Sequence, residues 1–63
     1  MADYRLYFHD RNGHIQAAEE FVCLDDAEAL GISEDLLKGA PGELWQLARR
    51  VRKFEAAKQA RRF

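Results

Sequence analysis

An Asn-Gly dipeptide at positions 12 and 13 separates two segments rich in strand-forming residues, and this pattern predicts a β-hairpin at the start of the chain. Asn-Gly favours a two-residue type I′ turn, because both central residues of that turn need positive φ. Such a loop would place Tyr4 opposite Phe21. In this register one face of the hairpin is apolar except for Glu19, and a bulge or a longer loop that begins at Asp10 would explain the exception.

A helix is expected over residues 27–38, because Asp25 or Asp26 provides an N-cap and acidic residues follow in the first turn. Gly39 and then Pro41 end it. With 100° of rotation per residue, the small and apolar residues of this segment share one face, namely Ala29, Leu30, Ser33, Leu36 and Leu37.

The segment after the helix is ambiguous. By propensity and period, residues 43–54 predict a second helix, with Leu44, Leu47, Ala48, Val51 and Phe54 on one face. The net charge of −1 also hides a division at this point, since residues 1–43 carry −7 and residues 44–63 carry +6. Such asymmetry is typical of contact with nucleic acid or an acidic protein, or of a basic segment that lies against the acidic half of its own or a neighbouring chain.

Length and composition limit the classes of function. A chain of 63 residues forms one domain and has little room for an enclosed pocket of about 300 Å³. Its longest apolar run, residues 21–24, is far shorter than the roughly 20 residues of a membrane span, and residues 1–5 do not begin a secretory signal. We therefore expect a cytoplasmic protein without membrane contact, whose single cysteine, Cys23, is a small buried hydrophobe.

No constellation in the sequence predicts catalysis. His9, Asp10 and His14 flank the first turn and have the chemistry of metal ligands, but solvated histidines beside an aspartate turn are the simpler interpretation. No nucleophile has a base at a useful spacing. We expect no enzyme activity, no catalytic residue, no metal and no cofactor.

The basic segment is the one feature with binding chemistry. Guanidinium groups bind phosphates and carboxylates in bidentate geometry, and an aromatic ring can stack on bases. On a strand, Arg50 and Arg52 would share a face with Phe54. We also predict that Trp45, the only tryptophan, is substantially buried against the helix, because a small core cannot easily do without the largest apolar side chain. The candidate binding residues are Arg49, Arg50, Arg52, Lys53 and Trp45.

Several short motifs resemble those of a family of short uncharacterised bacterial proteins, known as a domain of unknown function. The motifs are Tyr-Arg-Leu-Tyr-Phe-His-Asp at residues 4–10, Gly-His-Ile at 13–15, Asp-Asp-Ala-Glu-Ala at 25–29, Glu-Leu-Trp-Gln at 43–46 and Arg-Arg-Val at 49–51. The resemblance covers residues 4–54 and implies the order β-β-α-β-β, in which residues 43–46 and 50–54 form a second hairpin. The family often has glycine before Ala48, where this chain has Leu47. No biochemical activity follows from the resemblance.

We favour this α+β fold, a small antiparallel sheet with one packed helix, because three or more strands on a helix are stable whereas a lone hairpin is marginal. The alternative is β-β-α-α with a basic C-terminal helix. Residues 1–54 would form the single domain, and residues 55–63 a basic tail that is helical or frayed.

The expected function is a small non-catalytic protein-interaction module that associates with itself as a homodimer. A small core and open sheet edges both favour pairing. The alternative is a small nucleic-acid-binding protein that uses the basic C-terminal segment.

Overall fold

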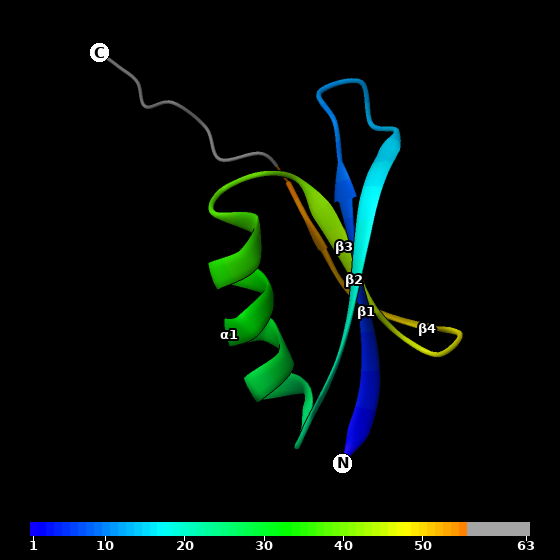
Figure 1. Cartoon of the computed structure of the whole chain (residues 1–63), viewed down its shortest axis with the longest axis vertical. Helices are drawn as coiled ribbons and strands as arrows, with labels where there is room; N and C mark the ends of the chain where they lie inside the picture. The colour runs from blue at the N-terminus through cyan, green and yellow to red at the C-terminus, as the bar shows by residue number, and fades with distance from the viewer. Residues whose placement is uncertain (56–63) are drawn as a thin grey trace.

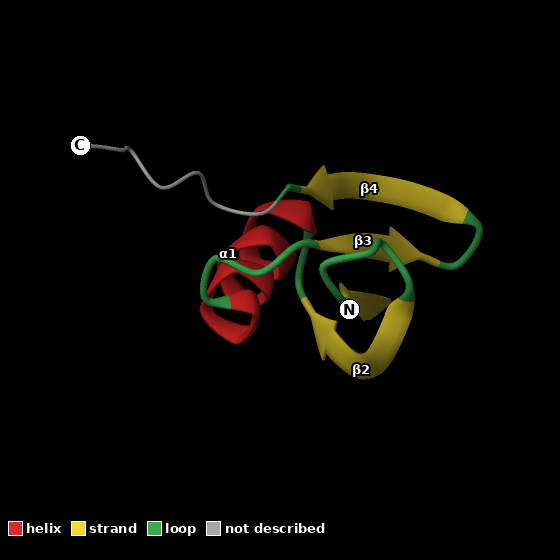
Figure 2. Ribbon diagram, turned by 90° about the horizontal axis from the view of Figure 1, so that it is seen from above, coloured by secondary structure: helices red, strands yellow, loops and turns green. Residues whose placement is uncertain are grey.

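The computed structural model describes residues 1–55, which form one four-stranded antiparallel sheet with a single helix on one face (Figures 1 and 2). The elements are β1 (Ala2–His9), β2 (Ile15–Cys23), α1 (Asp26–Leu37), β3 (Gly42–Gln46) and β4 (Arg49–Phe54). The strands lie in the order β2-β1-β3-β4. The predicted α+β class and β-β-α-β-β order are therefore confirmed, and the alternative C-terminal helix over residues 43–54 is wrong. Within the described chain, α1 is too short and too polar to cross a bilayer. The tail expected over 55–63 lies, from residue 56 onward, outside the described residues.

The first hairpin has the predicted register, with Tyr4 opposite Phe21, but its loop differs. Asp10 accepts the N–H of Gly13 at 3.0 Å and donates its own N–H to the carbonyl of His14 at 2.8 Å. Its carboxylate also accepts the backbone N–H groups of Asn12 and His14, at 2.8 and 2.9 Å. Gly13 alone in this loop has positive φ, at 87°. The expected two-residue type I′ loop is therefore wrong, because the carboxylate of Asp10 organises a three-residue loop that ends at Gly13.

Glu19 needs no bulge to explain it. Glu19 faces Leu6, as the register requires. It is nevertheless exposed, because β2 is an edge strand and no other part of residues 1–55 packs on its first half, residues 15–20. The register shift of this hairpin lies instead between Phe8 and His9, next to the loop.

Helix α1 begins at side chains that satisfy free backbone groups and ends in a left-handed backbone turn. Asp25 is the N-cap and accepts the N–H of Glu28 at 3.0 Å, while the carboxylate of Glu28 accepts the N–H of Leu24 at 2.8 Å. This reciprocal arrangement closely follows a capping box. At the other end Lys38 has a left-handed φ of 52° and Gly39 follows with a φ of 88°.

The core lies between α1 and the two central strands. Leu6 of β1 and Leu44 of β3 are paired and fully buried, and Ala29, Ser33 and Leu37 of α1 cover them. The hydroxyl of Ser33 donates to the carbonyl of Ala29 at 2.8 Å, so the one buried polar side chain is satisfied. Leu36, expected on the buried face, is 42% exposed, because one narrow sheet covers only the central stripe of the helix.

Gly42 determines how closely the helix end approaches the sheet. It is buried between its partners Phe8 and Phe54. A Cβ at this position would lie 2.4 Å from the carbonyl oxygen of Tyr7 and 2.8 Å from Cδ2 of Leu37. The missing side chain therefore lets Leu37 pack directly onto β3.

The second hairpin contains two backbone irregularities. Leu47, in the turn, has a φ of 55°, a conformation that favours glycine. Between Leu44 and Trp45 the register of β4 shifts, so that Leu44 pairs with Arg52 but Trp45 pairs with Arg50. The extra residue, Val51, packs against the core. Because of this bulge Arg50 and Arg52 lie opposite residues of different sheet faces, and the expectation that they share one face is wrong.

Candidate interaction surface

The face of the sheet turned away from α1 carries the tryptophan. In β3, Leu44 points to the helix and is fully buried, so its neighbour Trp45 points to the other face, where it is half-buried. The indole Nε1–H donates to Glu43 Oε1 at 2.9 Å. The prediction that Trp45 packs against the helix is therefore wrong. We call this side of the sheet the open face, because no described element covers it (Figure 2).

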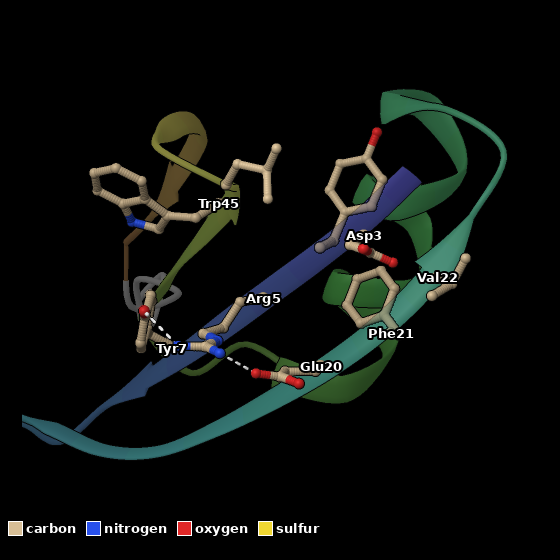
Figure 3. Close-up of a pocket in the computed structure, with 9 residues that line it drawn as sticks. Asp3, Arg5, Tyr7, Glu20, Phe21, Val22 and Trp45 are labelled. Atoms are coloured by element: carbon tan, nitrogen blue, oxygen red, sulfur yellow. Dashed lines mark hydrogen bonds and ion pairs between the residues drawn. The ribbon is translucent and has the colours of Figure 1, made fainter. Parts of the chain in front are cut away.

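A hollow of about 650 Å³ lies on the open face. It extends from β2 across β1 to the end of the β3–β4 hairpin (Figure 3). The hollow is lined partly by polar and partly by large apolar side chains. Among them are Arg5, Tyr7, Glu20, Val22, Trp45 and Leu47. Val22 is 52% exposed and Leu47 is 81% exposed. The hollow is partly open to solvent.

The polar groups of the hollow are bonded to one another. Arg5 forms an ion pair with Glu20 of β2 and donates to the hydroxyl of Tyr7 at 3.5 Å (Figure 3). The hydrogen bond to Tyr7 and then the one to Glu20 raise the pKa of Arg5 above its usual value. Arg5 therefore stays charged and holds β1 to β2 across the hollow.

Charge is divided across the open face. The half of the open face formed by β1 and β2 carries two acids and one base, namely Asp3, Glu20 and Arg5. The half formed by β3 and β4 carries two bases and one acid, namely Arg50, Lys53 and Glu43. Arg50 Nη1 lies 3.6 Å from Glu43 Oε2. The β2 flank therefore carries a formal charge of −1 and the β4 flank a charge of +1.

Arg49 takes part in a separate polar cluster at the start of the helix. Its guanidinium donates to both carboxylate oxygens of Asp26, at 3.2 Å each, and the hydroxyl of Tyr4 donates to the same carboxylate at 2.6 Å. The hydrogen bond from Arg49, and then the one from Tyr4, lower the pKa of Asp26 below its usual value. The hydrogen bond to Asp26, assisted by burial, raises the pKa of Tyr4 to about 12. The cluster thus ties β1, α1 and β4 together.

The predicted binding residues do not form one cluster in the structure. Arg49 is bound to Asp26 and Arg50 to Glu43, while the guanidinium of Arg52 lies 5.9 Å from the centre of the Phe54 ring. Lys53 and Trp45 remain on the open face. Arg49 and Arg50 therefore pair with acids from the first 43 residues of their own chain. This agrees with the interpretation that the basic segment lies against the acidic half of its own chain. Lys58, Arg61 and Arg62 lie outside the described residues.

The other candidates have structural roles. Asp10 organises the first loop, and its carboxylate lies 3.9 Å from Nδ1 of the exposed His14. Residues 1–55 contain no group of three or more side chains that could hold a metal ion. Cys23 is buried as predicted, and burial raises the pKa of its thiol.

Sequence reasoning did not find the hollow or the Tyr4–Asp26–Arg49 cluster. Both depend on contacts between distant residues, and the only local signal was the adjacent pair Leu44-Trp45, whose two side chains must point to opposite faces of a strand.

No protein-family model matches the chain, and no curated protein or solved structure matches it. The family resemblance stays a prediction, and the function must be argued from the residues themselves.

Proposed function

We propose that the protein is a small, non-catalytic interaction module that associates with a second copy of itself through the open face. The single observation that carries the proposal is the hollow, where Trp45, Val22 and Leu47 present apolar surface that no described residue covers. Burying such surface is the main favourable term in protein association. In this proposal the protein is cytoplasmic.

Two further features favour a second copy over an unrelated partner. The open face has an acidic flank at β2 and a basic flank at β4, and a two-fold axis would place each flank against the opposite flank of the partner. The edge strands favour face-to-face packing, because β2 carries Glu19 and Glu20 and β4 carries four basic residues, so either edge would repel its own copy.

The size of the open face sets the expected affinity. Strands about 4.8 Å apart, each rising about 3.3 Å per residue, give a face of the order of 400–500 Å² per chain. A pair of such faces is at the low end of specific interfaces. We therefore expect a dissociation constant of about 10–100 µM.

Sedimentation equilibrium of the full chain tests this proposal, over concentrations from about 5 to 500 µM and at low and high salt. We expect the mass to rise from monomer to dimer, and the dimer to persist at high salt because Trp45, Val22 and Leu47 supply apolar contacts that salt does not screen. A monomer mass at every concentration would contradict the proposal.

Nucleic-acid binding is the competing outcome. Trp45 and Tyr7 lie on the two central strands, and base stacking on such rings is sequence-tolerant. The ion pairs of Arg49 and Arg50 and the near-neutral open face favour the dimer instead. If a monomer bound a labelled single-stranded oligonucleotide with an affinity that fell steeply with salt, the nucleic-acid function would replace the proposed one.

A further inference from the structure

Leu47 is the most exposed large hydrophobic residue of the two hairpins and lines the hollow. It is 81% exposed, in the β3–β4 turn, and its φ of 55° is a conformation that glycine would adopt without strain. An exposed leucine at a position that favours glycine contributes nothing evident to the monomer. It does place a protruding apolar side chain beside a hollow whose lining is partly apolar.

The hollow offers apolar surface on both sides of β1. Its far wall, across β1 from Leu47, is formed by Val22 of β2, which is 52% exposed. Trp45 of β3 lines the hollow on the other side of β1 from Val22 (Figure 3). A volume of about 650 Å³ is ample for a leucine side chain together with the turn that carries it.

We propose that Leu47 of each chain inserts into the hollow of the other, so that the dimer interface consists of two reciprocal knob-in-hollow contacts. This inference rests on the proposed self-association and names the contact that produces it. A protrusion and a cavity on one face are self-complementary under two-fold symmetry, because one axis brings both pairs together. The acidic β2 flank of one chain then meets the basic β4 flank of its partner.

Two variants damage the two halves of this contact separately. Leu47→Asp removes the protruding side chain, and aspartate tolerates positive φ. Val22→Asp places a charge on the wall that receives it. Leu24→Asp is the matched control, since Leu24 is also an exposed leucine, at 71%, but does not line the hollow. Thermal unfolding followed by circular dichroism establishes that each variant is folded.

Sedimentation of each variant alone gives the first result. We expect Leu47→Asp and Val22→Asp each to weaken dimerisation at least about tenfold, whereas Leu24→Asp changes the dissociation constant less than about twofold. If the wild-type chain forms a dimer and Leu47→Asp leaves its dissociation constant unchanged, this inference is overturned while the proposed function stands. A wild-type monomer would overturn both.

Mixing the two damaged chains gives the decisive result. In a mixed dimer the intact Leu47 of the Val22→Asp chain meets the unchanged Val22 wall of the Leu47→Asp chain, so one of the two contacts is restored. We expect the mixture to associate more tightly than either variant alone. If instead the mixture associates no more tightly than the tighter-binding of the two variants, while both chains are folded, the reciprocal contact is refuted.

Discussion

The two faces of the sheet are built from neighbouring residues but differ in what they bury. On the helix side, Leu6 and Leu44 are fully buried beneath α1. On the open face, Trp45 is only half-buried and Leu47 is 81% exposed. The larger aromatic therefore lies on the face that folding does not cover. The difference teaches that in this small protein Tyr4 and smaller residues form the buried core, and the largest apolar side chain stays on the face where we propose contact with a second copy.

The largest expected loss of stability comes from shortening Leu44, on the helix side of the sheet. Leu44→Ala should destabilise the chain by about 3 kcal/mol, because a fully buried leucine leaves a cavity, whereas Trp45→Ala should cost only about 1 kcal/mol in the monomer. Urea unfolding at low micromolar concentration measures both. Equal losses for the two variants would mean that the faces do not differ as described.

The second effect tests how closely the helix approaches the sheet at Gly42. Gly42→Ala should destabilise by about 2 kcal/mol, since its Cβ would overlap the carbonyl of Tyr7. The matched control is Gly31→Ala, on the exposed side of α1, where a Cβ meets nothing within 4 Å. That variant should gain about 0.5–1 kcal/mol of helix propensity. A neutral Gly42→Ala would show that helix and sheet are less tightly packed.

The third effect concerns pH and the cluster that joins the helix to the sheet. The pKa of Tyr4 is raised to about 12 in the folded chain, against about 10 when unfolded. The protonated phenol therefore contributes stability that is complete below pH 10 and is lost as the pH rises through 12. Asp26, whose pKa is lowered, contributes stability that is lost as the pH falls below the ordinary aspartate range.

Ultraviolet titration of the wild type and of Tyr4→Phe isolates the phenol of Tyr4 by difference. We expect the difference to titrate near pH 12 and the variant to lose less stability between pH 10 and pH 12. A Tyr4 that titrates at the ordinary value of about 10 would mean that its hydrogen bond to Asp26 is absent.

The smallest expected change in stability comes from a substitution at Leu47, beside the open face and away from the core. Leu47→Gly should stabilise the monomer by about 0.5–1 kcal/mol, because glycine adopts the φ of 55° without strain. Ala48→Gly, at a turn position without positive φ, should be destabilising by a similar amount. Thermal unfolding at low concentration compares the two variants. A loss of monomer stability in Leu47→Gly would show that this leucine supports the fold itself.

Much of the fold was predictable from local signals. Asp25 and Gly39 gave the limits of the helix. The β1–β2 register agrees with the one expected from a two-residue loop, because the shift between Phe8 and His9 compensates for the extra loop residue. The β3–β4 hairpin followed from the resemblance and from the instability of a lone hairpin, against the helical propensity of its residues.

The positions of side chains on the second hairpin were not predictable. Leu44 and Trp45 are adjacent and both apolar, so only the pairing of Leu44 with Leu6 decides which of them faces the helix. The bulge at Val51 has no sequence signal and sends Arg50 and Arg52 to different faces. The partner of Arg49, Asp26, is 23 residues away, so the bond appears only once the chain is folded.

The central claim is that the open face, and not the helix side, contacts a second chain. The most direct test is the indole N–H resonance of Trp45, the only tryptophan, followed by nuclear magnetic resonance while the wild-type protein is diluted from about 500 to 5 µM. We predict that this resonance moves with concentration and gives the same dissociation constant as sedimentation. An indole resonance that stays fixed while the mass rises to that of a dimer would contradict the account.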